Sequence, residues 1–216
     1  MSYPVNLNVE GKPILVVGGG AVASRKVLGL LEAGAEVTMV APAFEAALEE
    51  LEAGGHINLR RRPFKGDDLD GVFLAFAATN NESVNESVSK EAALRGILVN
   101  VADQPQLCTF TLPAVLRRGG LTIAVATNGD CPAFAGTLRE ELESRYGVEY
   151  GPVLEFFGRL RRRLIKEGWE SARIKDAVSE LYDGGIADLI SQGDEKSLEF
   201  LLVRTLGSDR FFPPEG

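Results

Sequence analysis

The sequence predicts an α/β fold whose core is a doubly wound parallel sheet, followed by a small α+β segment and a helical C-terminal tail. In the first half, short apolar runs rich in β-branched residues alternate with helix-length segments, as in right-handed βαβ units. After residue 149 the pattern is helical throughout. We therefore expect three parts: residues 1–112, 113–148 and 149–216.

The first part is expected to contain five strands and three helices. Ile14–Val17 is a continuous apolar run, typical of a central strand covered on both faces. Gly34 and the pair Gly54-Gly55 are expected to end helices. The other strands are expected at residues 36–41, 56–61, 72–77 and 97–101, and the helices at 21–33, 44–53 and 82–95.

The pattern changes near residue 109. Residues 109–112 and 121–126 resemble strands, with a turn region at 117–120 between them. The remaining segments are expected to be helices at residues 133–146, 153–167, 171–182 and 195–206, and a frayed tail at 211–216.

Composition and charge exclude several classes of protein. The chain is 45% hydrophobic and 25% charged, as in soluble globular domains. A net charge of −8 disfavours nucleic-acid partners. No apolar run approaches the length of about 18–20 residues that a membrane span needs, and we see no signal peptide. With only two cysteines, the sequence favours a reducing, cytoplasmic setting without disulfides.

A glycine-rich turn follows the first strand. Gly18, Gly20 and Ala23 match the G-x-G-x-x-[GA] spacing of a Rossmann-type dinucleotide site, in which free N–H groups at the helix N-terminus hold a pyrophosphate. A tight turn without a ligand is the alternative. The acid expected about 20 positions later, at the end of the second strand, is replaced by Ala41-Pro42, which leaves NAD against NADP open. The candidate cofactor-binding residues here are Gly18, Gly19, Gly20, Ala21, Val22 and Ala41.

Polar residues follow the fourth and fifth strands, at the carboxyl edge where open α/β sheets bind ligands. Thr79 and Asn80 can contact a ribose or nicotinamide, but Asn80 or Asn81 can also cap the next helix. Asp103 comes directly after a buried strand and can orient a substrate N–H or accept a proton. An Asx turn before Pro105 is the alternative interpretation.

A second polar loop begins at Thr127-Asn128, before a helix. Its hydroxyl and amide groups can hold a carboxylate or phosphate, or can simply cap the helix. No metal site is expected, because His56 is isolated and Cys108 and Cys131 lack a zinc spacing.

Taken together, these motifs resemble the precorrin-2 dehydrogenase family, the NAD-dependent module of siroheme synthase. The resemblance covers residues 3–146 and loosens beyond residue 151. Its motifs lie at residues 16–26, 40–42, 77–79, 99–103, 110–113, 118–127 and 132–142.

The resemblance implies oxidation of precorrin-2 to sirohydrochlorin with NAD as cofactor, and in some members insertion of Fe²⁺ or Co²⁺ into the product. It assigns Asp103 the catalytic role, as a general base or as an orienter of pyrrole N–H groups, and places Thr127 near the substrate. Asn128, in the same polar loop, is a further candidate for substrate binding. Because the tetrapyrrole is rich in carboxylates, local positive charge is needed. Arg117, Arg118 and Arg139 are the candidates for it. The resemblance also implies a homodimer.

Two other functions are considered. One is an NAD(H)-sensing regulatory module without catalysis, which would need neither Asp103 nor the second polar loop. The other is a dehydrogenase for a different small acid, which would ordinarily use a His or Lys base. His56 is poorly placed for that task, so the precorrin-2 reaction is favoured.

Overall fold

A computed structural model of the protein describes residues 2–207. The chain forms two compact units, Met1–Leu112 and Pro113–Gly216. The division into three parts expected from the sequence stays a prediction, and the expected frayed tail lies outside the described residues.

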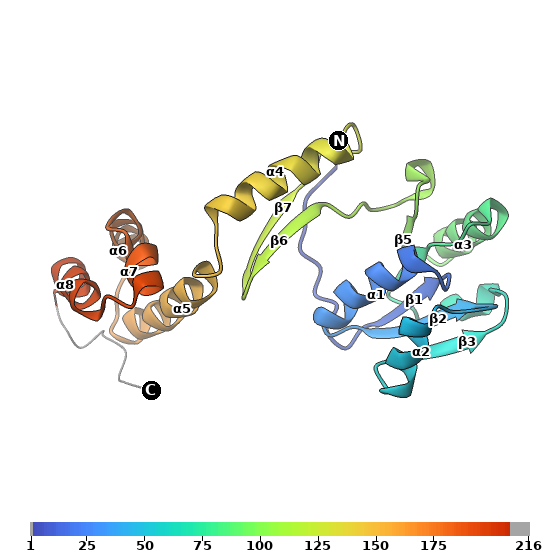
Figure 1. Ribbon diagram of the computed structural model, residues 1–216, viewed down its shortest axis with the longest axis horizontal. Coiled ribbons are helices and arrows are strands. Elements are labelled where there is room, and N and C mark those ends of the chain that lie inside the picture. Colours follow the sequence, from blue (N-terminus) through green and yellow to red (C-terminus); the bar gives the residue numbers. More distant parts are fainter. Residues whose placement is uncertain (1, 208–216) are drawn as a thin grey trace. The chain divides into compact units, whose positions relative to one another are not determined.

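The N-terminal unit is built on a five-stranded sheet in the order β3-β2-β1-β4-β5 (Figure 1). All neighbouring strands are parallel. The order reverses on either side of β1, which makes the sheet doubly wound as predicted. The strands are β1 (Pro13–Val17), β2 (Glu36–Ala41), β3 (Ile57–Arg61), β4 (Leu74–Ala77) and β5 (Leu98–Val101).

Both faces of this sheet are covered. On one face, α1 (Ala21–Glu32) and α2 (Ala46–Ala53) pack against alternate residues of the central strands, such as Val16 and Phe76. On the other face, α3 (Glu82–Leu94) and the 3₁₀ turn η1 (Gly66–Leu69) pack against the intervening ones. Burial on both faces explains why the strands are nearly continuous apolar runs.

The helix ends fix the loops between the elements. Helix α1 ends in a Schellman motif: Gly34 has φ +75°, its N–H donates to Leu31, and the N–H of Ala35 donates to Leu30. Gly34 thus terminates α1 as expected, directly after the capping residue Ala33. This sharp end lets the chain return at once into β2.

The C-terminal unit begins with an antiparallel pair, β6 (Ala114–Arg118) and β7 (Leu121–Val125), followed by α4 (Pro132–Arg145). Two expectations were wrong here. The first strand lies at 114–118 rather than 109–112, and the turn is confined to Gly119-Gly120, with Arg117 and Arg118 inside β6. The two glycines suffice for the turn, because Gly119 adopts the left-handed conformation, with φ +55°, without a steric cost.

Four helices complete the C-terminal unit: α5 (Tyr150–Lys166), α6 (Ser171–Asp183), α7 (Ile186–Gln192) and α8 (Glu195–Leu206). They enclose their own apolar core, to which α5 contributes Val153, Phe156, Leu160 and Leu164 at helical spacing. The sequence analysis missed α7, a short helix bounded by Gly185 and Gly193 in left-handed conformations. None of the helices within residues 2–207 is long and apolar enough to cross a membrane.

Candidate active site

The carboxyl edge of the parallel sheet collects the candidate residues of the N-terminal unit. Ala41 ends β2, and the segments Gly18–Val22, Thr79-Asn80 and Asp103 follow β1, β4 and β5. Because these strands run parallel, the loops that follow them meet at one edge. The reversal of strand order beside β1 places the glycine loop at the middle of that edge.

The physical reason for having glycine differs among the three positions of this loop. A Cβ on Gly18 would lie 2.2 Å from the Ala78 carbonyl oxygen, and one on Gly19 would lie 2.0 Å from that of Ala43. The fold itself therefore requires glycine at these two positions. A Cβ on Gly20 would meet nothing within 4 Å, and its backbone is extended, with φ −99° and ψ −173°. The chain's own packing does not require glycine there.

The open space at Gly20 lies in front of the N-terminus of α1. Gly20 is the N-cap, so no side chain caps the helix, and the first turn carries no acidic residue. The positive end of the helix dipole therefore faces this space. An extended glycine with no neighbour fits the close approach of a pyrophosphate better than a tight turn without a ligand.

The loop after β2 contacts the glycine loop, and β2 ends in Ala41 rather than in an acidic residue. Ala41 is buried, with 6% of its surface exposed. The backbone N–H of Glu45 donates to the Gly19 carbonyl over 2.9 Å, and Glu45 serves as the N-cap position of α2. The role of Ala41 in cofactor binding stays a prediction.

The loop after β4 is held by a buried asparagine. The Thr79 hydroxyl donates to Oδ1 of Asn85 over 2.7 Å, and Nδ2 of Asn85 donates to the Thr79 carbonyl over 3.1 Å. Asn85 is only 3% exposed. The residue that caps α3 is Asn81, whose side chain accepts from the N–H of Val84. Asn80 is exposed and is not the N-cap residue of α3, and contact of Thr79 or Asn80 with the cofactor stays a prediction.

The loop after β5, which carries Asp103, is held by hydrogen bonds back to β5. The sulfur of Cys108 accepts the N–H of Val101 over 3.1 Å, and the Thr109 hydroxyl accepts that of Val99 over 2.7 Å. Together with a backbone bond from the Thr109 N–H to the Val99 carbonyl, 2.9 Å long, these side-chain bonds hold the segment to β5, and residues 109–112 are not a strand. Ser89 on α3 adds a bond to the Leu107 carbonyl, 2.9 Å long.

Asp103 itself is exposed and strained. Its φ of +58° lies in the left-handed region, which Asp tolerates better than most residues. Within residues 2–207 no hydrogen bond or ion pair to its carboxylate is found, so the side-chain bond that defines an Asx turn is not formed. The carboxylate is available to a ligand at the edge of the sheet. Strain of this kind is concentrated at functional sites.

A lysine beside this loop was missed by the sequence analysis. Nζ of Lys26, on α1, donates to Oδ1 of Asn100 over 2.9 Å. Burial lowers the pKa of Lys26, while Cys108 and Asp103 act to raise it. The only signal in the sequence was Asn100 itself, a polar residue inside the otherwise apolar run of β5.

The candidate residues of the C-terminal unit lie on β6, α4 and the turn before α4. The Thr127 hydroxyl accepts the N–H of Cys131 over 3.3 Å, and Asn128 has φ +52° within the turn. Arg118 and Arg139 both bind Glu143, over 3.2 and 2.5 Å, and together they lower its pKa. Arg117 is exposed on β6. Binding of substrate by these five residues stays a prediction.

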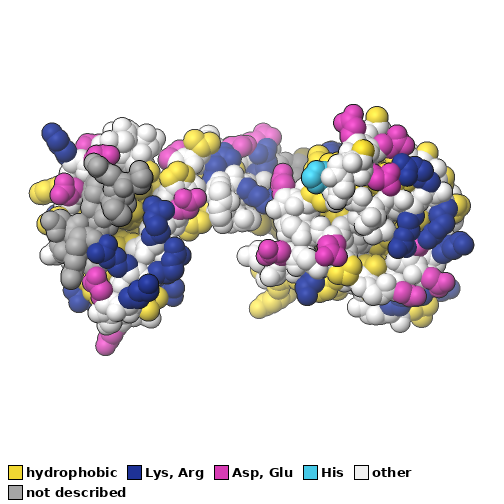
Figure 2. Space-filling model, turned by 90° about the horizontal axis from the view of Figure 1, so that it is seen from below, with side chains coloured by type: hydrophobic (Ala, Val, Ile, Leu, Met, Phe, Trp, Pro, Cys, Tyr) yellow, Lys and Arg dark blue, Asp and Glu magenta, His cyan; other side chains and the backbone are white. Residues whose placement is uncertain are grey.

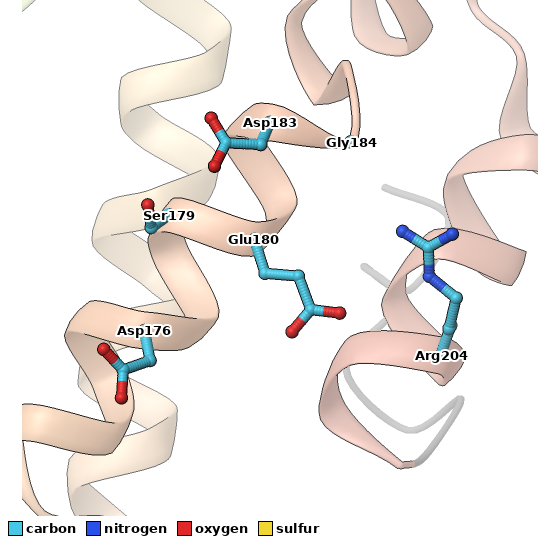
Figure 3. A pocket seen from close by; sticks show the side chains of 6 residues that line it. All are labelled: Asp176, Ser179, Glu180, Asp183, Gly184 and Arg204. Atoms are coloured by element: carbon cyan, nitrogen blue, oxygen red, sulfur yellow. The ribbon is translucent and has the colours of Figure 1, made fainter.

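Two other features do not join the candidate site. His56 is exposed and directly precedes β3, so it lies at the amino end of the sheet; it is the cyan side chain in Figure 2. A hollow of about 470 Å³ lies between α6 and α8 in the C-terminal unit (Figure 3). Three of its side chains are carboxylates, on Asp176, Glu180 and Asp183, which suits a carboxylate-rich ligand poorly.

No group of three His, Cys, Asp or Glu side chains that can hold a metal ion occurs within the described part of the chain.

Two family models match the chain. Residues 5–114 match a family model for NAD(P)-binding domains, and residues 118–145 match the model of the sirohaem biosynthesis protein central domain. Siroheme synthases from Nitrosococcus oceani and Pseudomonas fluorescens are each 38% identical, over 100% and 98% of this chain and 46% of their own lengths. The chain thus spans a little under half the length of these relatives.

A solved structure matches along its full length. The structure of "SirC, precorrin-2 dehydrogenase" is 30% identical and superposes with a TM-score of 0.76, covering 96% of this chain and 100% of that one. Fold and glycine loop thus define a Rossmann-type NAD(P)-binding protein. The chain belongs to the precorrin-2 dehydrogenase family, which includes the matching region of siroheme synthases.

Proposed function

We propose that this protein oxidises precorrin-2 to sirohydrochlorin with NAD⁺, a step in the synthesis of siroheme or a related modified tetrapyrrole. Family membership supports this function. The observation that carries it is the exposed Asp103 carboxylate, held in a left-handed loop at the same sheet edge as the open space at Gly20. A cofactor site and a proton acceptor are thereby on one edge.

The oxidation removes a hydride and a proton from the substrate. NAD⁺, when bound, supplies the hydride acceptor. The N–H groups of the first turn of α1 hold its pyrophosphate, and Asn85 fixes the Thr79 loop along the same edge. The Asp103 carboxylate accepts the proton or hydrogen-bonds the pyrrole N–H groups that lose protons. Its exposure keeps it accessible to a large substrate.

The substrate's carboxylates need cationic partners on this acidic chain. Arg117, Arg118 and Arg139 are proposed to supply positive charge, and Thr127 with Asn128 to supply polar contacts. The pairing of Arg118 and Arg139 with Glu143 means that a substrate carboxylate must compete with that glutamate.

The function is tested by anaerobic incubation of the protein with precorrin-2 and NAD⁺. NADH and the sirohydrochlorin absorbance are expected to appear together. NAD⁺ binding without turnover would instead favour the NAD(H)-sensing module, and turnover with NADP⁺ alone would reassign the cofactor.

Metal insertion into sirohydrochlorin is a second candidate activity. The observation that favours it is the unpaired Asp103 carboxylate, which can accept the pyrrole protons displaced when a metal ion enters, while the four tetrapyrrole nitrogens act as the ligands. Adding Co²⁺ or Fe²⁺ to the product, with and without protein, measures whether insertion is accelerated.

The protein is also proposed to form a homodimer through the segment after residue 112. An isolated two-stranded sheet is marginally stable in water, and β6–β7 pairs with no further strand among the described residues. Phe134 on α4 is 53% exposed, so apolar surface is available nearby. Light scattering should give twice the mass of 23.2 kDa.

A further inference from the structure

The ammonium group of Lys26 is held at the carboxyl edge of the sheet, beside the Asp103 loop. The Lys26 side chain extends from α1 over the ring of Phe76, with Nζ 5.5 Å from the ring centroid. Nζ donates to Oδ1 of Asn100 over 2.9 Å, and Nδ2 of Asn100 donates to the Phe110 carbonyl over 3.1 Å. The ammonium is therefore held in place by an acceptor that is itself fixed.

The pairing of Lys26 with Asn100 is not explained by stability. Asn100 is only 7% exposed, in a strand whose neighbouring residues Val99 and Val101 are fully apolar. Burial also lowers the pKa of Lys26, which means that its charged form loses hydration there. Replacing buried polar pairs by apolar residues of similar size is often neutral or stabilising. A polar pair kept at this edge therefore points to a ligand.

N–H donors of the Lys26 ammonium and the carboxylate of Asp103 remain without hydrogen-bond partners among the described residues. An ammonium group has three N–H donors, and within residues 2–207 Asn100 is the only hydrogen-bond acceptor found for Lys26. Asp103 is near enough to act on the pKa of Lys26, yet no ion pair within 4.0 Å joins the two among the described residues. A cation and an anion thus lie near each other without neutralising each other by contact.

We propose that Lys26 binds a carboxylate of the tetrapyrrole while Asp103 meets its pyrrole N–H groups, so that Lys26 sets the orientation of the macrocycle. Such a substrate offers an acceptor to the ammonium and donors to the carboxylate at once. The inference rests on the proposed function and deepens it by naming a substrate-positioning residue. Asn100 serves as the fixed support that aims the ammonium.

The test is the binding of sirohydrochlorin, the product of the proposed reaction, to the full chain. Binding is measured from the change in the absorbance of sirohydrochlorin. In Lys26→Met the side chain keeps its packing on Phe76 but loses the charge. The dissociation constant is expected to rise at least about tenfold, as for loss of one charge-assisted hydrogen bond. Lys26→Arg should remain within about threefold of the wild type, because it keeps a cation. The affinity for NAD⁺, measured by calorimetry, should be unchanged in both.

Arg25→Met is the matched control. Arg25 is the neighbouring exposed cation on α1, so its loss changes the net charge equally without touching Asn100. Three outcomes would each overturn the inference. They are an equal loss of sirohydrochlorin affinity in Lys26→Met and Arg25→Met, a parallel loss of NAD⁺ affinity, and unchanged sirohydrochlorin affinity in Lys26→Met. If thermal unfolding shows that Lys26→Met does not fold, Lys26→Gln, which keeps an N–H donor, replaces it. A wild-type protein that neither binds sirohydrochlorin nor produces NADH contradicts the proposed function itself.

Discussion

The loop after β1 and the loop after β5 lie at the same sheet edge but are built in opposite ways. The first consists of small residues, whose fit depends on carbonyl groups of neighbouring loops only 2.0–2.2 Å from where a Cβ would be. The second is held by side chains, through Cys108 and Thr109, and projects the carboxylate of Asp103. One loop offers backbone N–H groups, and the other offers a functional side chain.

Under the proposed function, this difference would separate the recognition of two ligands. A cofactor pyrophosphate is common to many enzymes and can be held by backbone alone, provided that side chains are absent. A particular substrate requires particular side chains at particular positions. Substitutions in the first loop are therefore expected to act on cofactor affinity or folding, and those in the second on turnover or product affinity.

The largest expected effect is that of Asp103→Asn. Asn tolerates the left-handed backbone as well as Asp does, so the loop should keep its conformation. Loss of the proton acceptor is expected to lower kcat by about 10²–10⁴-fold, while NAD⁺ affinity stays unchanged. Anaerobic NADH formation and calorimetry measure the two quantities.

Asp67→Asn is the control for Asp103→Asn, because Asp67 is an exposed carboxylate on η1, outside this edge. Its turnover should equal that of the wild type. Unchanged turnover in Asp103→Asn would remove this residue from the mechanism and leave the two loops without a division of roles.

Gly20→Asp should lower NAD⁺ affinity by at least about 100-fold without unfolding the protein. Asp is a good N-cap, so the N-terminus of α1 should be as stable as in the wild type or slightly more stable. The same carboxylate would occupy the open space and repel the pyrophosphate. Calorimetry with NAD⁺ and thermal unfolding measure the two effects.

Gly20→Asn adds the same bulk without the charge, and should weaken NAD⁺ binding less. Gly29→Ala, in an open position in the middle of α1, should leave affinity unchanged and stabilise the helix by up to about 1 kcal/mol. Full NAD⁺ affinity in Gly20→Asp would show that the space at Gly20 is not the cofactor's.

Gly19→Ala, one position earlier, should act on stability instead. The added methyl group would lie 2.0 Å from the Ala43 carbonyl oxygen, so the backbone of one of the two loops must move. Overpacking of this kind costs about 1–3 kcal/mol. Urea unfolding of Gly19→Ala and the wild type measures the change. Equal stability would mean that these loops shift freely and that the contact does not define the edge.

The sequence predicted much of this edge because the glycine loop depends on local rules. Strand and helix patterns placed the parallel sheet, and the spacing of Gly18, Gly20 and Ala23 identified the glycine loop. The sequence did not distinguish the reasons for the glycines, since Gly18 and Gly19 depend on contacts with Ala78 and Ala43, which are distant along the chain.

The surroundings of Asp103 were less predictable, because they depend on contacts between residues that are distant along the chain. Lys26 and Asn100 are 74 positions apart, and only the packing of α1 across β4 brings them together. The strand expected at residues 109–112 does not form; Cys108 and Thr109 bind β5 largely through their side chains, beside one backbone bond from Thr109 to Val99. The periodicity of apolar residues in the sequence does not reveal hydrogen bonds between side chains and backbone. It also missed α7, whose seven residues are too few to establish a helical pattern.

Asp68 is a carboxylate in the same unit as Asp103 but in the opposite situation. Its side chain is 2% exposed and accepts hydrogen bonds from Arg62, over 2.5 Å, and Arg60, over 2.7 Å. The hydrogen bond from Arg62, helped by those from the Lys65 N–H and Arg60, lowers its pKa from 3.8 to about 2. A carboxylate so paired supports folding rather than chemistry.

The Asp68 contribution should depend on pH in a defined direction. Because the folded-state pKa is the lower one, the stabilisation is present above about pH 4 and is lost as the pH falls toward 2. It amounts to about 2 kcal/mol. Asp68→Asn should therefore be less stable than the wild type by about that much at pH 6 in urea unfolding, with unchanged NAD⁺ affinity. The gap should narrow between pH 4 and pH 2, where the wild-type carboxylate takes up its proton; a gap independent of pH would show that hydrogen bonding to a neutral group, and not the ionised pair, holds this segment.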